Sequence, residues 1–168
     1  MNLADHLRRL SDFSGRESRR AFWPYVGVMV AVSFLAMTLA MSAFVLPVIL
    51  AVEAGNMPNV LVAISPFFLT VLAFVAMLAA AVVRRLHDRG VSGWWALPTP
   101  LLLMGGVVAF GIEMNAFLGG AGIEDETFAG LFAVLLLLNG LYIASLSGLT
   151  TVLCLPGQPR SNRFGPPP

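Results

Sequence analysis

The sequence predicts an all-α integral membrane protein: one domain over residues 1–168, with a bundle of four transmembrane helices and a short N-terminal interfacial helix. The composition supports this, because 58% of the residues are hydrophobic and 11% are charged, whereas a soluble domain has about 25% charged residues. The apolar residues also fall into four long runs. Each run has at least the roughly 18 residues that a helix needs to cross the hydrocarbon core.

Residues 1–22 precede the first apolar run and are expected to form a cytoplasmic amphipathic segment. Three leucines share one helical face here: Leu3, Leu7 and Leu10. This pattern favours a short helix in the headgroup layer, and a frayed terminus fits it equally well. Ser14 and Glu17 have capping-box spacing, so we expect the first long helix to start near Gly15.

The transmembrane helices are expected at residues 23–45, 60–83, 94–112 and 128–154. Gly90 suits the C-terminal cap of the second helix and Ser92 the start of the third, which predicts a tight antiparallel hairpin between them. Pro98, Pro100 and three glycines would bend or interrupt the third helix, so its continuity is left open.

Helix association is expected to rely on small and polar residues, because apolar burial drives little association within lipid. Small residues recur every fourth position in the last helix and are expected to mark the contacts: Gly140, Ala144 and Gly148. Asn139 is expected to hydrogen-bond across helices. The expected spans contain no Asp, Glu, Arg or His, which disfavours proton-coupled transport.

The basic residues predict the orientation. All ten are arginines, and they lie before the first span, between the second and third, and after the fourth. The other two expected loops contain no basic residue, and they carry the acidic residues Glu53, Glu113, Glu124, Asp125 and Glu126. The positive-inside rule therefore places both termini in the cytoplasm, with residues 156–168 as an extended, proline-rich tail.

The segment RRLHDRGVSGWW, residues 84–95, is the main candidate site. Asp88 lies four residues after Arg84 and three after Arg85, so it can pair with either on a helix. An orientation signal gains nothing from an acid, which makes Asp88 informative. Arginines beside boundary tryptophans such as Trp94 suit phosphate groups. A structural hydrogen-bonding role that ties the three cytoplasmic segments together explains Asp88 at least as well as catalysis does.

Three segments, FSGRESRRAFW, RRLHDRGVSGWW and NRFGPPP, resemble in order and spacing the bacterial inner-membrane proteins grouped as domain of unknown function 805. The resemblance implies a small, multi-pass, four-helix protein of the bacterial cytoplasmic membrane, and it supplies no reaction. The residues that match by position are Gly15, Arg16, Arg19, Phe22, Trp23, Arg84, Arg85, His87, Asp88, Ser92, Gly93, Trp94, Asn162, Arg163 and Gly165.

The leading functional hypothesis is a non-enzymatic protein that binds an anionic lipid headgroup, a phosphate-bearing ligand or a partner protein at its arginine-rich face. A homo-oligomer is left open, and no nucleic acid, cofactor or metal is expected, since the usual phosphate-loop and metal motifs are missing from the sequence. The candidate binding residues are Arg16, Arg19, Arg84, Arg85, His87, Asp88, Trp94, Asn162 and Arg163. Two alternatives are kept: a membrane-surface enzyme with His87 as acid or base and Asp88 as its orienter, and a small-molecule permease or export component.

Overall fold

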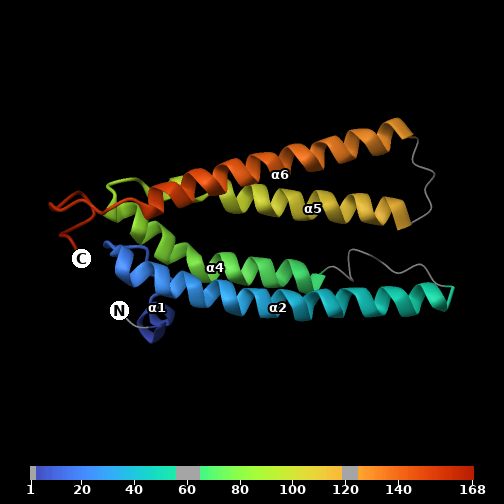
Figure 1. Ribbon diagram of the computed structural model, residues 1–168, viewed down its shortest axis with the longest axis horizontal. Coiled ribbons are helices and arrows are strands. Elements are labelled where there is room, and N and C mark those ends of the chain that lie inside the picture. Colours follow the sequence, from blue (N-terminus) through green and yellow to red (C-terminus); the bar gives the residue numbers. More distant parts are fainter. Residues whose placement is uncertain (1–2, 56–64, 119–124) are drawn as a thin grey trace.

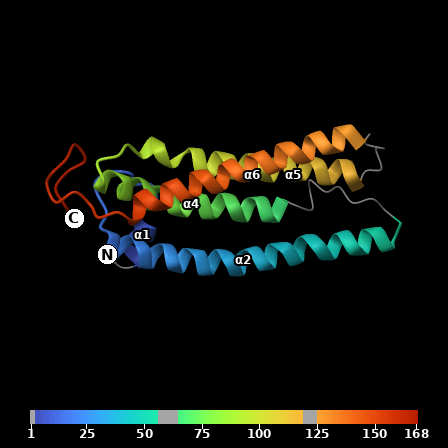
Figure 2. The same cartoon turned by 45° about the horizontal axis from the view of Figure 1, so that its top comes forward.

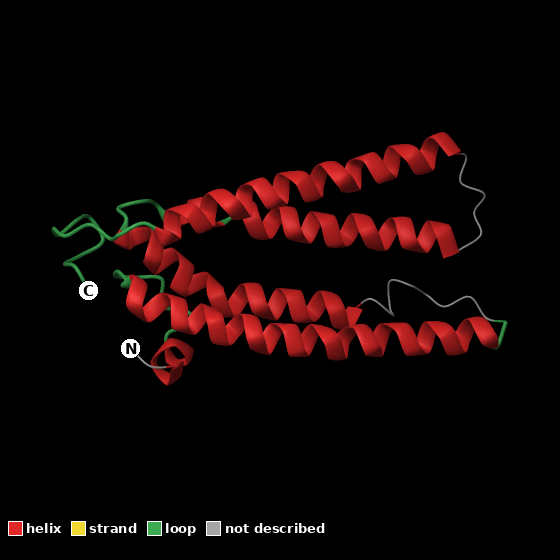
Figure 3. Cartoon of the chain, in the orientation of Figure 1, coloured by secondary structure: helices red, strands yellow, loops and turns green. Residues whose placement is uncertain are grey.

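The computed structural model describes residues 3–55, 65–118 and 125–168. Within these ranges the chain is helical apart from its connections and C-terminal tail, and it forms no strand of a sheet (Figure 3). The elements are α1 Leu3–Arg8, α2 Arg19–Glu53, α4 Ser65–Asp88, the 3-10 helix η1 Gly93–Ala96, α5 Pro98–Leu118 and α6 Asp125–Cys154. The predicted all-α fold is confirmed.

The four long helices have the length and composition of membrane spans: Arg19–Ala51, Ser65–Asp88, Gly93–Ala116 and Ala129–Cys154. Their outer surfaces consist of large apolar side chains. Phe34, for example, is 77% exposed and Leu137 is 62% exposed. In a bilayer these side chains face lipid tails instead of water, and helices satisfy their own backbone hydrogen bonds there. The chain is a multi-pass membrane protein.

The long helices pack as two pairs. α2 lies along α4, and α5 lies along α6. The two pairs meet at the end where both chain termini lie, and they diverge toward the opposite end (Figure 1). In the turned view α4 lies between α2 and the α5–α6 pair (Figure 2). The predicted tight hairpin between the second and third spans is therefore wrong, since the packing partner of α5 is α6.

The C-terminal cap of α4 agrees with the sequence. Gly90 has a φ of 74°, a left-handed conformation that favours glycine. Its N–H donates to the carbonyl of His87 at 2.9 Å, and the N–H of Val91 donates to the carbonyl of Leu86 at 3.0 Å. These two bonds form a Schellman motif, which ends the helix and turns the chain.

The connection after this cap separates α5 from α4. η1 packs on α4 so closely that a Cβ on Gly93 would lie 2.6 Å from Cγ1 of Val83. Ser92 precedes η1 and makes no side-chain capping bond, so its predicted role at the start of the third long helix is wrong. α5 begins only at Pro98 and is continuous to Leu118, because prolines in a first turn need no backbone N–H.

α2 begins later than the capping-box pattern predicts. The chain is non-helical from Gly15 to Ser18, and α2 starts at Arg19. Ser18 acts as the cap, because the N–H of Ala21 donates to its Oγ at 3.4 Å. The expected start near Gly15 is wrong because the carboxylate of Glu17 binds side chains of other segments instead of the helix end.

The small residues of α6 do not mark contacts between helices. Gly140, Ala144 and Gly148 are all exposed, and a Cβ added to either glycine would meet nothing within 4 Å. Asn139 donates to the carbonyl of Leu135 in its own helix at 3.0 Å. Within one chain, the expected helix contacts at the small residues and the expected hydrogen bond from Asn139 to another helix are therefore both wrong. For the small residues the reason is that sequence spacing does not distinguish a lipid-facing stripe from a helix-facing one.

One acidic residue that we assigned to a loop lies within a candidate span. Glu113 belongs to α5, which continues past the predicted end of the third span. Its side chain is buried, and its Oε1 has no hydrogen-bond partner among the described residues. The predicted span of residues 94–112 contains no ionisable residue, but α5 extends beyond it and includes Glu113.

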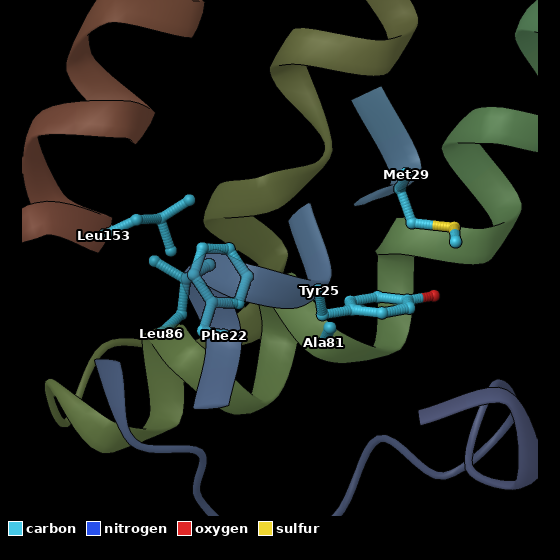
Figure 4. Packing of buried hydrophobic residues seen from close by; sticks show 6 residues of the cluster. All are labelled: Phe22, Tyr25, Met29, Ala81, Leu86 and Leu153. Atoms are coloured by element: carbon cyan, nitrogen blue, oxygen red, sulfur yellow. The ribbon is translucent and has the colours of Figure 1, made fainter. Parts of the chain in front are cut away.

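The buried apolar core joins α2, α4 and α6 (Figure 4). α1 packs beside it, since the ring of His6 stacks on the ring of Tyr25 with 4.2 Å between their centroids. The Tyr25 hydroxyl donates to the carbonyl of Met77 at 2.7 Å and so joins α2 to α4. The core residues are Phe22, Tyr25 and Met29 of α2, Ala81 and Leu86 of α4, and Leu153 of α6.

Candidate functional site

The two ends of the molecule carry opposite charge. We call residues 3–20, 84–96 and 155–168 the arginine-rich end; they lie together where the chain begins and finishes (Figure 1). This end holds all ten arginines and four of the nine acidic residues, so its side chains have a net formal charge of +6 with histidine neutral. The four acids are Asp5, Asp12, Glu17 and Asp88. The other five belong to α2, α5, α6 and the segment that connects α5 to α6.

Asp88 binds two buried arginines from different segments. Its Oδ1 accepts from Nε and Nη2 of Arg16 at 3.0 and 2.8 Å, and its Oδ2 accepts from Nη1 of Arg85. All three side chains are at most 4% exposed. Charge-assisted hydrogen bonds of this kind are stronger than neutral ones. Asp88 therefore ties the segment before α2 to the end of α4.

Glu17 forms a second junction of the same kind. Its Oε2 accepts from Nε of Arg84 at 2.9 Å, and its Oε1 lies 2.7 Å from Nε2 of His6. The three side chains are at most 2% exposed. Nη1 of Arg84 also donates to the carbonyl of Arg9 at 3.0 Å. Glu17 thus joins α1 and the following segment to α4.

Other guanidinium N–H groups bind the end of α6 and the tail. Nε of Arg85 donates to the carbonyl of Leu153 at 3.0 Å, and Nη1 of Arg19 donates to that of Cys154 at 3.3 Å. The last carbonyls of a helix have no partner within the helix and carry partial negative charge, so cations stabilise them. Nη1 of Arg16 donates to the carbonyl of Arg160 at 2.9 Å, which fixes the tail.

The tail folds back onto α4 through a tight turn. The backbones of Asn162 and Gly165 exchange two hydrogen bonds of 3.1 and 3.0 Å, and Nδ2 of Asn162 donates to the carbonyl of His87 at 3.0 Å. The ring of Phe164 stacks on that of His87 with centroids 3.8 Å apart. The guanidinium of Arg163 lies 4.7 Å from the Phe164 ring centroid. The proline-rich tail is therefore docked on the helices.

Close backbone approach also holds the tail. A Cβ on Gly157 would lie 1.9 Å from Oδ2 of Asp88, and a Cβ on Gly90 would lie 2.7 Å from Nε2 of Gln158. The N–H of Gln158 donates to the carbonyl of Asp88 at 2.9 Å. A side chain at position 157 would therefore displace the tail from the buried Asp88 carboxylate, whereas one at position 90 would require the Gln158 amide to shift.

The arginines divide into two groups. Arg16, Arg84 and Arg85 are buried and ion-paired, and Arg9 forms a half-exposed pair with Asp12. Hydrogen bonds from Ser14 and Arg9 hold the pKa of Asp12 well below its usual range. Among the described residues, the other six arginines form no ion pair. Five of these six are exposed: Arg8, Arg19, Arg20, Arg160 and Arg163.

The structure brings together most of the candidate residues, and it leaves one outside. Trp94 is 78% exposed, and its neighbour Trp95 is 70% exposed, so neither belongs to the buried network. Asp88 and His87 do not bind each other, because Asp88 contacts arginines and Nδ1 of His87 lies 3.2 Å from the carbonyl of Gly15. The other candidate residues lie together: Arg16, Arg84, Arg85, His87, Asp88 and Asn162 form the network, and Arg19 and Arg163 are exposed beside it.

Sequence reasoning missed several members of the network. The sequence predicts a helix cap for Glu17, an amphipathic segment around His6 and an extended tail around Gln158. The available signal was that Glu17, like Asp88, is an acid within a basic stretch. In the described parts of the chain, no three His, Cys, Asp or Glu residues are grouped as metal ligands.

A model of the family described as Protein of unknown function (DUF805) matches residues 10–166, almost the whole chain. No curated protein and no solved structure matches the chain significantly. The matched region contains the network residues from Arg16 to Gly165, and His6 lies before it. The chain belongs to the DUF805 family, as its three motif segments predict.

Proposed function

We propose that this DUF805 protein is a non-enzymatic protein of the bacterial cytoplasmic (inner) membrane that binds anionic phospholipid headgroups at its arginine-rich end. The observation that carries the proposal is the division of the arginines. Buried guanidinium groups are already bound to carboxylates and carbonyls, whereas five arginines are exposed without an ion pair among the described residues.

The positions of the exposed arginines support headgroup binding. Arg19 and Arg20 occupy the first turn of α2, directly before its apolar stretch. Arg163 is held above the ring of Phe164 by the docked tail. A guanidinium group presents several N–H donors in a plane that matches phosphate oxygens. The buried network thus supports a platform that presents Arg19, Arg20 and Arg163.

Two further features support binding at the membrane surface. Trp94 and Trp95 are exposed at the arginine-rich end, and tryptophan favours headgroup depth. The positive-inside rule assigns this end to the cytoplasm, where the leaflet carries anionic lipid and attracts each nearby arginine by about 1 kcal/mol. Three arginines then favour an anionic over a neutral lipid by about a hundredfold.

The enzyme alternative receives no support from the geometry. A histidine acting as acid or base needs an orienting partner and access to a substrate. Asp88 binds Arg16 and Arg85 instead of His87, and the face of the His87 ring is covered by Phe164.

The proposal can be tested by native mass spectrometry of protein from micelles that contain equal amounts of phosphatidylglycerol and phosphatidylcholine. The parent protein should retain phosphatidylglycerol preferentially. The triple variant Arg19→Gln/Arg20→Gln/Arg163→Gln should lose this preference. None of the three side chains belongs to a buried ion pair, so the variant should keep the fold.

A matched variant with lysine at the same three positions keeps the charge and should keep most of the preference. Added salt should weaken the preference, because exposed charges are screened. Equal retention of both lipids by the parent, or an unchanged preference in the glutamine variant, would contradict headgroup binding. Displacement of phosphatidylglycerol by inorganic phosphate would show that the site takes a soluble phosphate group instead.

A further inference from the structure

A cavity of about 330 Å³ lies between the two helix pairs. All four long helices line it, with Met41 from α2, Phe67 from α4, Gly106 and Phe110 from α5, and Asn139 and Tyr142 from α6. This volume is within the range of small-molecule sites, which measure about 300–1,000 Å³. The cavity is separate from the arginine network, since none of its lining residues belongs to the arginine-rich end.

The position of the cavity determines what can enter it. Its lining residues belong to helices with the length and composition of membrane spans, and Asn139 lies in the middle of α6. At this depth the surrounding medium is hydrocarbon. The wall is formed mainly by Leu, Val, Phe and Met side chains. An occupant must therefore be mostly apolar and must come from the bilayer.

Two polar groups in the wall lack partners among the described residues. Asn139 uses its Nδ2 to bind the carbonyl of Leu135 at 3.0 Å, and no hydrogen bond engages its carbonyl oxygen. The Tyr142 hydroxyl also makes no hydrogen bond with the described residues. Elsewhere in the spans, Thr38 and Thr70 donate to the carbonyl four residues earlier in their own helices. Leaving polar groups unpaired in hydrocarbon is costly.

The two groups can be satisfied by one ligand group. Asn139 and Tyr142 are three residues apart on α6, so they project from the same helix face, and both line the cavity. The free Asn139 oxygen is an acceptor, and the Tyr142 hydroxyl can donate. A ligand hydroxyl can donate to the first and accept from the second. A hydrocarbon without a polar group can do neither.

We infer that this cavity binds a long-chain alcohol from the bilayer, with its chain against the apolar wall and its hydroxyl between Asn139 and Tyr142. The inference does not depend on headgroup binding, because no arginine takes part. It differs from that proposal in its ligand, its depth in the membrane and the helices involved.

Gly106 provides a direct way to block the site. A Cβ added at Gly106 would meet nothing within 4 Å, although the residue lines the cavity. The side chain introduced by Gly106→Leu can therefore grow into the empty space. Gly148 has equally open surroundings and is exposed on α6, outside the lining. Gly148→Leu is thus a matched control for the added bulk.

The test uses the full chain in nanodiscs of phosphatidylcholine alone, which removes any contribution from anionic headgroups. The probes are a diazirine-bearing hexadecanol and the corresponding alkane without the hydroxyl. After illumination, labelled peptides are identified by mass spectrometry. The alcohol should label the cavity-lining segments of α5 and α6 in the parent and in Gly148→Leu. It should not label these segments above background in Gly106→Leu.

The second variant tests the hydrogen bond without filling the cavity. Asn139→Leu should reduce labelling by the alcohol about fivefold below saturation, as expected for one neutral hydrogen bond, and should leave labelling by the alkane unchanged. Equal labelling by the two probes in the parent would overturn the inference, because it would indicate unspecific contact with lipid. Unchanged alcohol labelling in Gly106→Leu would overturn it as well.

Discussion

The two ends of this membrane protein hold their helices together differently. At the arginine-rich end, Asp88 binds the buried guanidinium groups of Arg16 and Arg85, which also donate to carbonyls of the tail and of α6, and the helix pairs meet there. In the opposite half the pairs diverge (Figure 1). A cavity lies between them. Apolar contact gives little association within lipid. The comparison indicates that buried polar junctions determine where the two pairs join.

The variant Asp88→Asn should have the largest effect, because it removes the partner of two buried arginines. Breaking a buried ion pair from one side costs about 3–5 kcal/mol, so the free energy of unfolding in micelles should fall by roughly that amount. Glu53→Gln changes an exposed carboxylate at the other end of α2 and should alter this free energy by less than about 0.5 kcal/mol. Similar losses in both variants would remove the distinction between the ends.

Gly157→Ala should have an intermediate effect. The new Cβ would lie 1.9 Å from Oδ2 of Asp88 and must displace the tail, with an expected loss of about 1–3 kcal/mol. Gly148→Ala adds the same methyl group at an open position of α6, where alanine favours the helix by about 1 kcal/mol. Thermal unfolding of the two variants should therefore shift in opposite directions. A shift of both in the same direction would show that the tail does not pack closely on Asp88.

Thr99→Val should have the smallest effect. Oγ1 of Thr99 lies 2.8 Å from Oγ of Ser145, which joins α5 to α6 outside the arginine-rich end. A hydrogen bond between membrane helices contributes about 0.6 kcal/mol on average. Thr151→Val is the control, because Thr151 binds a carbonyl of its own helix. The free energies of chemical unfolding of the two variants should differ only slightly. A loss of free energy in Thr99→Val as large as that in Asp88→Asn would contradict the predicted order of effects.

The sequence alone predicts the spans and the convergence of the arginines for clear physical reasons. Hydrocarbon thickness sets the length of an apolar run, and the positive-inside rule depends on charge position. Asp88 was identified because an acid between arginines needs an explanation. These features depend only on where the chain passes between hydrocarbon and water. They do not depend on which helices contact one another.

Features that depend on contact between distant segments could not be predicted. Glu17 binds His6 and Arg84, which are 11 and 67 residues away, and its local spacing fits a capping box as well. η1 packs on α4 while α5 packs on α6, an arrangement that the local signals at Gly90 and Ser92 do not specify. The stripe at Gly140 and Gly148 looks like a contact surface in sequence and faces outward in the fold.

The most direct test of the central claim measures whether Asp88 fixes the tail to the N-terminal segment. Spin labels at Ser11→Cys and Ser161→Cys, both exposed positions, are introduced in a Cys154→Ser background. Electron–electron distance measurements should give one narrow distribution for this protein and a broad, longer one when Asp88→Asn is added. A distribution that stays equally narrow after Asp88→Asn would contradict the claim that buried charge pairs hold this end together.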